Sequence, residues 1–258
     1  MHIKMKIFLV PSSLGCLNKN KGCEDAPNAI LSSLKKLELN ENHYPLIFEV
    51  KEVKVNKNNI EETMDNIFNT VEEGIVIGGD HSITYSCFKK FSQKYKNPGM
   101  IIFDAHADCV NNFKITHEDF VQVLISEKIL KKENLIYVGL RSVYKKEKEF
   151  LGKNNIQIFN MKSVAAGISN VCDMLMEKIR GCDGIYLSID IDVLDPSCAP
   201  GTGYLSPGGM TTRQLLYFIQ RLKKLKNLKM MDLVEVNPQK DINDMTIEAG
   251  AKILGELL

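Results

Sequence analysis

The sequence lacks several features that mark specialised classes of protein. It has no C-x-x-C pair, and its seven cysteines are an odd, scattered set, which argues against a disulfide framework and favours a reducing compartment. No stretch approaches the roughly 20 apolar residues of a transmembrane helix. Lys and Arg number 33 against 32 Asp and Glu, so no excess of charge indicates a nucleic-acid or membrane partner. We therefore expect a cytoplasmic protein that binds neither nucleic acid nor membrane.

Short apolar runs alternate with longer amphipathic segments along the 258 residues. The apolar runs predict strands at residues 6–10, 46–53, 74–77, 100–105, 135–140, 156–159, 184–189 and 230–236. The segments between them predict helices at residues 27–37, 60–72, 83–94, 145–154, 164–180, 211–225 and 247–258. Near-continuous apolar strands that alternate with helices are typical of a parallel sheet covered by helices on both faces. The length fits one domain of this α/β class, spanning residues 1–258.

Several helix ends carry recognisable signals. Thr211 and Gln214 have the spacing of a capping box. Asp25 precedes Pro27, which is tolerated in the first turn of a helix. Ser163 is a plausible cap for the helix at residues 164–180.

Histidines and carboxylates follow four of the predicted strands. The runs are GGDHS at 78–82, DAHAD at 104–108, DID at 190–192 and EVNP at 235–238. Ligands of open α/β sheets bind beyond the carboxyl ends of the strands. Crowded carboxylates repel one another unless a cation lies among them. Each run alone could be only a strand-end cap or a tight turn, but together they predict a site for two metal ions. Oxygen-rich ligation with some imidazole and no thiolate suits Mn²⁺ better than Zn²⁺.

With SIDIDVLDPSCAPGTG at 188–203, GGMTTRQ at 208–214 and GCEDAP at 22–27, these runs make the sequence resemble the ureohydrolase family, which includes arginase, agmatinase and formimidoylglutamase. The resemblance implies an arginase-like fold, a doubly wound, mostly parallel sheet of about eight strands. It also implies two Mn²⁺ per chain, although other divalent metals remain open, and a homo-oligomer, either a trimer or a hexamer. The implied metal ligands are His81, Asp104, His106, Asp108, Asp190 and Asp192.

The resemblance implies that a metal-bridging hydroxide attacks the guanidinium carbon of a small guanidino substrate, giving urea and an amine. Asp108 would carry a proton to the leaving nitrogen, His117 would relay protons to solvent, and Glu235 would hold the guanidinium. A structural role for His117 stays open, because Glu118 stands where the family usually has glycine and Thr116 could cap a helix.

The distal group of the substrate is open at this point. The loop at residues 109–116 looks shorter than its arginase counterpart and lacks a Ser-Gly-Asn stretch, and Ser142 stands where arginase carries aspartate. This pattern favours agmatine or a related guanidino compound over L-arginine. Lys114 would instead favour a carboxylate if it faced the pocket. The candidate substrate-binding residues are Asn111, Asn112, Thr202 and Glu235.

Three alternatives to this hypothesis differ in measurable ways. A formimidoylglutamase-type enzyme would act on a formimino group. A deacetylase-like hydrolase would typically bind one Zn²⁺ with one set of ligands. A catalytically silent, metal-binding scaffold would usually lose ligands, whereas all six positions are filled in this sequence.

Overall fold

The computed structural model describes residues 5–110 and 112–258. Within these residues, eight strands form one sheet in the order β2-β1-β3-β8-β7-β4-β5-β6. All neighbouring strands are parallel, which confirms the predicted fold class. The strands are β1 Met5–Val10, β2 Phe48–Glu52, β3 Gly74–Gly78, β4 Pro98–Phe103, β5 Leu135–Val138, β6 Gln157–Phe159, β7 Gly184–Asp190 and β8 Leu228–Val234.

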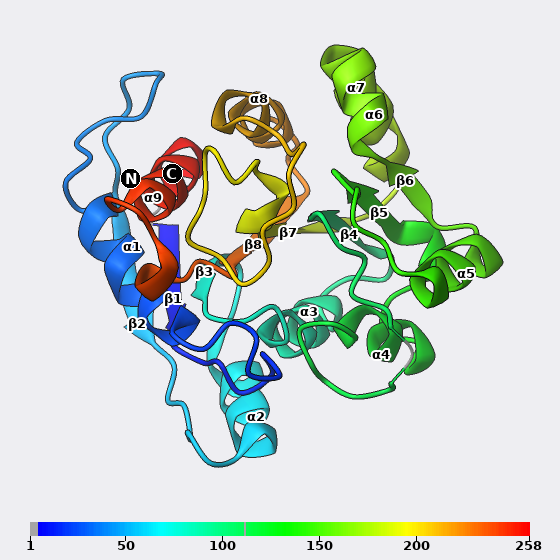
Figure 1. The fold of residues 1–258 in the computed structure, drawn as a ribbon, viewed down its shortest axis with the longest axis horizontal. Helices are drawn as coiled ribbons and strands as arrows, with labels where there is room; N and C mark the ends of the chain where they lie inside the picture. The colour runs from blue at the N-terminus through cyan, green and yellow to red at the C-terminus, as the bar shows by residue number, and fades with distance from the viewer. Residues whose placement is uncertain (1–4, 111) are drawn as a thin grey trace.

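Helices cover both faces of the sheet (Figure 1). One face packs against α1 Ala26–Leu34, α6 Met161–Ala166, α7 Ile168–Ile179, α8 Thr212–Leu222 and α9 Met245–Leu257. The other packs against α2 Ile60–Thr70, α3 Ile83–Ser92, α4 Phe120–Ser126 and α5 Lys145–Asn154. Strand β1 shows why its sequence is apolar throughout, because Ile7 and Leu9 join one core while Phe8 and Val10 join the other. Short 3-10 turns lie at Cys23–Asp25, Lys132–Asn134, Ile191–Val193 and Pro238–Lys240.

One predicted helix start agrees with the structure, whereas the helix predicted at residues 164–180 and its cap do not. The capping box of Thr211 and Gln214 is present at the start of α8. The single helix predicted at residues 164–180 is wrong, because Gly167 separates α6 from α7. Asn160 caps α6, and its Oδ1 accepts a hydrogen bond from the Ser163 N–H at 3.0 Å. Ser163 is therefore not the cap, since a residue three positions earlier already supplies the acceptor.

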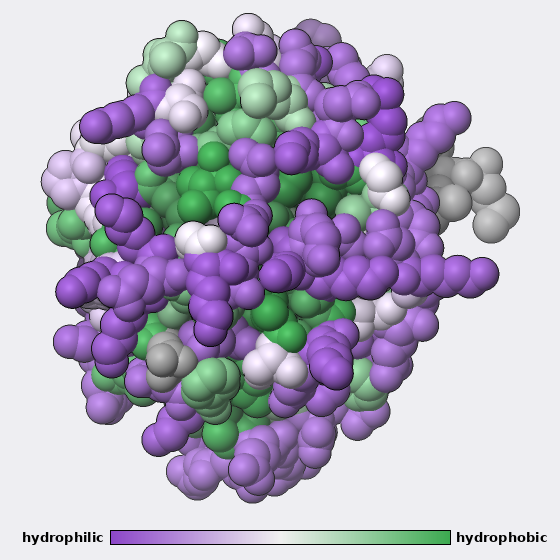
Figure 2. Space-filling model, turned by 90° about the vertical axis from the view of Figure 1, so that its right-hand side faces the viewer, coloured by the Kyte–Doolittle hydropathy of each residue, from purple (hydrophilic) through white to green (hydrophobic). Residues whose placement is uncertain are grey.

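Hydrophilic side chains cover most of the face beside β6 and α5, with hydrophobic ones visible in the gaps between them (Figure 2). Among residues 5–110 and 112–258, no helix has both the length and the hydrophobicity needed to cross a membrane. All seven cysteines are free, which agrees with the absence of a disulfide framework.

The sheet order brings the four motif-bearing strands together. Strands β3, β8, β7 and β4 are consecutive neighbours at the centre of the sheet, and each motif follows the carboxyl end of its strand. β3 and β4 follow each other in the sequence but are separated in the sheet by β8 and β7. A reversal of strand order of this kind opens a crevice where α/β proteins bind ligands.

Candidate metal centre and active site

The turn after β3 directs His81 into the protein. Gly79 packs so closely on Ser12 that a Cβ there would lie 1.9 Å from the Ser12 carbonyl oxygen, so only glycine fits. The Asp80 N–H donates to the same carbonyl at 2.9 Å, and Asp80 Oδ2 accepts from the Gly15 N–H at 3.0 Å. These contacts fix the turn, and the imidazole that follows is completely buried.

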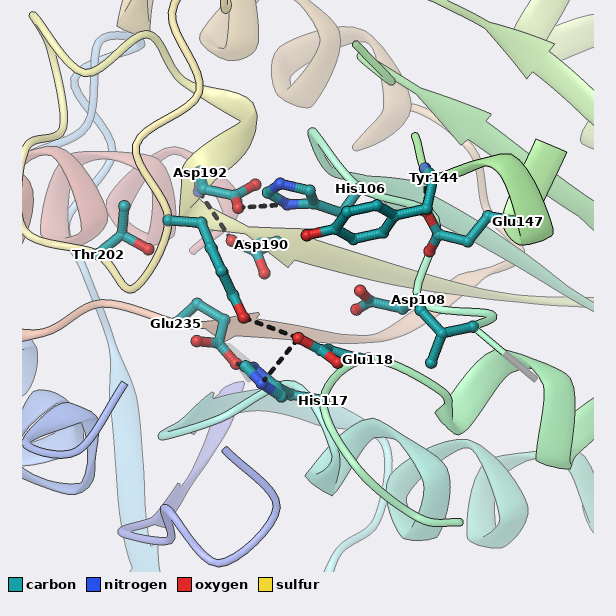
Figure 3. Close-up of a pocket in the computed structure, with 12 residues that line it drawn as sticks. His106, Asp108, His117, Glu118, Tyr144, Glu147, Asp190, Asp192, Thr202 and Glu235 are labelled. Carbon is teal, nitrogen blue, oxygen red and sulfur yellow. Dashed lines mark hydrogen bonds and ion pairs between the residues drawn. The ribbon is translucent and has the colours of Figure 1, made fainter. Parts of the chain in front are cut away.

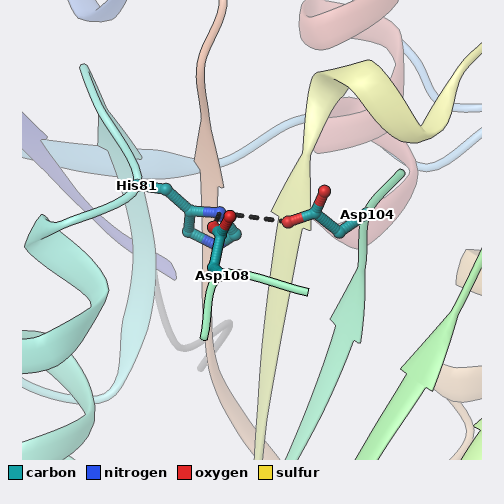
Figure 4. A group of neighbouring side chains, drawn as sticks. All are labelled: His81, Asp104 and Asp108. Atoms are coloured by element: carbon teal, nitrogen blue, oxygen red, sulfur yellow. Dashed lines mark ion pairs between the residues drawn. The ribbon is translucent and has the colours of Figure 1, made fainter. Parts of the chain in front are cut away.

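His81 lies within a group of three carboxylates. Its Nδ1 atom is 2.9 Å from Asp108 Oδ2 and 3.3 Å from both Asp104 Oδ2 and Asp190 Oδ2. Figure 4 shows the imidazole directed toward Asp104 and Asp108. Although it is close to three oxygens, Nδ1 is aligned for a hydrogen bond with none of them. One nitrogen that faces several carboxylate oxygens is the arrangement expected of ligands around a cation.

A second group surrounds His106. Its Nδ1 atom lies 2.9 Å from Asp192 Oδ2 and 3.7 Å from Asp104 Oδ1. Asp104 therefore presents one oxygen to each histidine, and the two groups with metal-ligand spacing share this residue. A carboxylate shared in this way could help to hold two adjacent metal ions.

The electrostatics of the site fit a bound cation. Burial, together with the charges of Asp108 and Asp192, raises the pKa of Asp104 well above its usual range. Burial and the charges of Asp192 and Asp104 do the same to the pKa of Asp190. Burial lowers the pKa of His81, but the neighbouring carboxylates raise it well above its usual value. Without a metal the site therefore takes up protons, and metal ions would supply the same compensation. The oxygen and nitrogen donors, without thiolate, fit Mn²⁺.

A chain of hydrogen bonds sets the tautomer of His81. The Ser188 hydroxyl donates to Asp232 Oδ1 at 2.6 Å, so its oxygen accepts from His81 Nε2 at 2.9 Å. Asp232 is fully buried and also accepts from the hydroxyls of Thr84 and Tyr186. Burial raises the pKa of Asp232, and the charge of His81 and these hydrogen bonds oppose the rise. With a metal ion bound, His81 would therefore keep its proton on Nε2 and offer its Nδ1 lone pair to the metal.

Glu235 lies beside the two groups, directly after β8. Its Oε1 accepts from the His81 N–H at 2.7 Å and lies 3.2 Å from His117 Nδ1. Its Oε2 accepts from Asn20 Nδ2 at 2.7 Å. Burial raises the pKa of Glu235, but the hydrogen bond with His117 outweighs it and lowers that pKa. Burial lowers the pKa of His117, and the same hydrogen bond raises it to about 9. Glu235 is thus a buried anion suited to holding a cationic group.

A pocket opens over these side chains (Figure 3). It is lined by His106, Asp108, Val110, His117, Glu118, Tyr144, Glu147, Asp190, Asp192, Thr202, Tyr204 and Glu235. His81 and Asp104 lie buried beside it. The structure thus brings the six predicted metal ligands, His117, Thr202 and Glu235 into one region.

The loop after DAHAD contributes less to the pocket than the sequence suggested. Asn111 lies outside the described residues. Asn112 is exposed and its N–H donates to Asp119 Oδ2 at 2.8 Å, and it is not part of the lining described above. Lys114 is also exposed and outside that lining. Thr116 does not cap the next helix, because α4 begins after Asp119.

Sequence reasoning missed six residues of the site. Five of them line the pocket, namely Val110, Glu118, Tyr144, Glu147 and Tyr204, and Asn20 anchors Glu235. The only sequence signal for Tyr204 is its position directly after the APGTG run. Asn20 carries no local signal, since it reaches Glu235 from 215 positions earlier in the chain.

The fold and site define a class of α/β protein that carries two adjacent groups of residues with metal-ligand spacing at the carboxyl ends of central parallel strands. The family model of the arginase family matches residues 3–258, and the chain belongs to this family. Membership confirms the predicted resemblance, and the relatives include proteins named arginase, formimidoylglutamase and agmatinase.

Individual relatives carry different names. An arginase of Staphylococcus aureus (strain MRSA252) is 34% identical over 198 residues, which are 70% of this chain and 66% of the relative, so the match spans slightly under two thirds of that protein. A formimidoylglutamase of Halalkalibacterium halodurans is 33% identical over 235 residues, 87% of this chain and 72% of the relative. Relatives named agmatinase also match. The crystal structure of formimidoylglutamase from Bacillus subtilis subsp. subtilis str. 168 has a TM-score of 0.92 and 27% identity, with 100% of this chain and 87% of that one covered. The arginase-like fold is thereby confirmed.

Proposed function

We propose that the protein is a binuclear Mn²⁺ hydrolase that cleaves a C–N bond of a guanidino compound to urea and an amine. The observation that carries this proposal is the position of Asp104, whose two oxygens face the His81 and His106 groups separately. Two metal ions bound there would supply a water activated near neutral pH. Their proposed ligands are His81, Asp104, His106, Asp108, Asp190 and Asp192.

The remaining roles follow from the positions of the side chains. Asp108 lines the pocket beside His81, where it can pass a proton to the leaving nitrogen. Glu235 holds the guanidinium. Thr202 lies next to Glu235, because an antiparallel β-bridge pairs Thr202 with Val236. His117 contacts Glu235 through Nδ1 and faces Glu118 through Nε2, so it links the inner pocket to the polar residues around it. A histidine in this place can exchange protons with solvent.

The proposed substrate is agmatine or a related guanidino compound. The Ser142 hydroxyl donates to Ser206 Oγ at 3.0 Å, and Ser142 is not among the residues that line the pocket. It therefore gives no support to L-arginine, for which the family carries aspartate at this place. A formimino substrate is the second candidate, favoured by the relatives named formimidoylglutamase. A cytoplasmic location and a trimer or hexamer remain parts of the proposal.

The test is to load the purified protein with Mn²⁺ and to measure urea release from agmatine, L-arginine, 4-guanidinobutyrate and 3-guanidinopropionate. Release of ammonia or formamide from formimidoylglutamate is followed in parallel. We expect two Mn²⁺ per chain and urea from one compound, with turnover abolished by Asp108→Asn. The matched control is Asp65→Asn, which removes an exposed carboxylate on α2 and should leave turnover unchanged.

Other outcomes would contradict the proposal in different ways. Formamide or ammonia without urea would assign a formimino substrate. A single metal per chain would favour the deacetylase-like arrangement. Two bound metals without any product would favour a catalytically silent scaffold.

A further inference from the structure

Glu118 places a carboxylate over the pocket, next to His117. Its Oε1 accepts a hydrogen bond from the Tyr204 hydroxyl at 2.7 Å and lies 4.0 Å from His117 Nε2. The Tyr204 ring stacks on His117, with 6.0 Å between the ring centroids, and lies 5.4 Å from the His106 ring. Tyr204 therefore fixes the Glu118 carboxylate in place, and its Oε2 has no hydrogen-bond partner among residues 5–110 and 112–258.

The lining of the pocket offers no positive charge from lysine or arginine among the described residues. Metal ions would offset the carboxylates of the metal groups, and the substrate guanidinium would offset Glu235. Glu147 is buried, its oxygens accept from the Tyr144 and Cys109 N–H groups, and burial raises its pKa. Glu118 remains as the partly exposed carboxylate, with 25% of its side chain accessible, that no metal or guanidinium would neutralise. His117 is the cationic group next to it, and this one imidazole faces both Glu118 and Glu235. A carboxylate-bearing substrate would meet repulsion there, whereas a cation would be attracted.

The spacing of the two glutamates suits the two ends of one substrate. The imidazole of His117 lies between them, 3.2 Å from Glu235 through Nδ1 and 4.0 Å from Glu118 through Nε2 (Figure 3). A guanidinium held at Glu235 and a cation held at Glu118 would thus lie on opposite sides of the His117 ring. Their separation would be set by the width of that ring and by its contacts with the two glutamates. A chain of a few methylene groups spans this separation, and Val110 and Tyr204 on the pocket wall supply apolar surface for it.

We propose that Glu118, held by Tyr204, binds the distal group of the substrate and that this group is a cation such as a primary ammonium. The proposal rests on the proposed function, because it takes Glu235 as the site of the guanidinium. It makes Glu118 a specificity-determining residue, and it excludes a carboxylate as the distal group.

The experiment compares agmatine, which ends in ammonium, with 4-guanidinobutyrate, which ends in carboxylate. We expect the Mn²⁺-loaded wild-type protein to have the higher kcat/KM on agmatine. Glu118→Gln keeps an oxygen that can accept from Tyr204 but removes the charge. It should lower the ratio of kcat/KM for agmatine to that for 4-guanidinobutyrate by about 10- to 100-fold, mainly through KM, the range expected when a hydrogen bond loses its charge. Glu118→Lys should invert the preference.

Two further variants separate charge from folding. Glu149→Gln removes an exposed carboxylate on α5 outside the pocket and should leave the ratio unchanged. Tyr204→Phe removes the hydroxyl that fixes Glu118 and should lower the ratio by less than Glu118→Gln does. Urea release with a ratio that Glu118→Gln does not alter, or a wild-type preference for 4-guanidinobutyrate, would overturn this inference and leave the proposed function intact. No urea from any guanidino compound would instead overturn the proposed function and the inference with it.

Discussion

Substitution of Ser188 tests whether a hydrogen bond to Nε2 of His81, the nitrogen that faces away from the carboxylates, fixes the tautomer of this proposed metal ligand. Its single hydroxyl proton goes to Asp232 Oδ1 at 2.6 Å, which leaves the oxygen to accept from His81 Nε2 at 2.9 Å. In Ser188→Ala the imidazole loses this acceptor, so its proton can move to Nδ1, the atom that faces the carboxylates. The variant removes one oxygen at a completely buried position and adds no bulk. It should therefore change metal binding more than folding.

The size of the effect follows from the kind of bond that is lost. Partners that hold a ligating histidine from behind typically contribute about 10- to 100-fold to metal affinity, which corresponds to roughly 1.4–2.7 kcal/mol. We expect the dissociation constant for Mn²⁺ at the His81 group to rise by about this factor. The group around His106 should be affected less, because Ser206, and not Ser188, lies 3.3 Å from His106 Nε2.

The assay is a titration of the metal-free protein with Mn²⁺, in which free Mn²⁺ is followed by electron paramagnetic resonance at constant pH. Ser92→Ala is the matched control, since Ser92 only donates to the Lys89 carbonyl at the end of α3. Thermal unfolding of both variants shows whether the fold is retained. Unchanged Mn²⁺ affinity in a folded Ser188→Ala protein, or equal weakening in Ser92→Ala, would refute the reasoning about the tautomer.

Two further predictions concern the site and the fold. Asn20→Asp would face Glu235 Oε2, now 2.7 Å from the buried amide nitrogen, with a second carboxylate. We expect kcat/KM for the guanidino substrate to fall about 10- to 100-fold, and steady-state kinetics that match the wild type would contradict this. The second prediction concerns Glu41. Hydrogen bonds from Arg213 and Gln220 lower the pKa of Glu41 to about 2. A lowered pKa means that the stabilisation is present above the usual carboxyl pKa and is lost as the pH falls toward 2. The side chain is 30% exposed, so the contribution is at most about 1 kcal/mol. Glu41→Gln should lower Tm by about 2–4 °C at pH 7. Thermal unfolding should show a smaller difference in Tm between the variant and the wild type at pH 3 than at pH 7. An equal difference in Tm at both pH values would argue against the ion pair.

The alternation of strands and helices could be predicted from the sequence because each strand is buried on both faces. Strand β7 has the sequence GIYLSID, and all seven of its residues are buried, so a continuous apolar run marks it without any need for the partner strands. The start of helix α8 could be predicted from the capping box formed by Thr211 and Gln214. The break at Gly167 was missed because residues 164–180 remain amphipathic on both sides of it, and one glycine within a helical pattern is a weak signal.

The metal groups and the substrate end of the pocket differ in how much a local pattern can reveal. His106, Asp104 and Asp108 lie within five consecutive residues after β4, so the motif itself carries their chemistry. The sequence did not reveal the order of the strands in the sheet. In that order β8 and β7 lie between β3 and β4, and it depends on contacts between distant segments that no short segment encodes. Glu118 was visible only as a departure from the family, since its meaning depends on Tyr204, which lies 86 positions later. The candidate metal ligands are thus encoded in short runs at strand ends, whereas Glu118, which we propose to bind the distal group, meets Tyr204 only in the folded chain. This is the physical reason that relatives with the same motifs can differ in substrate.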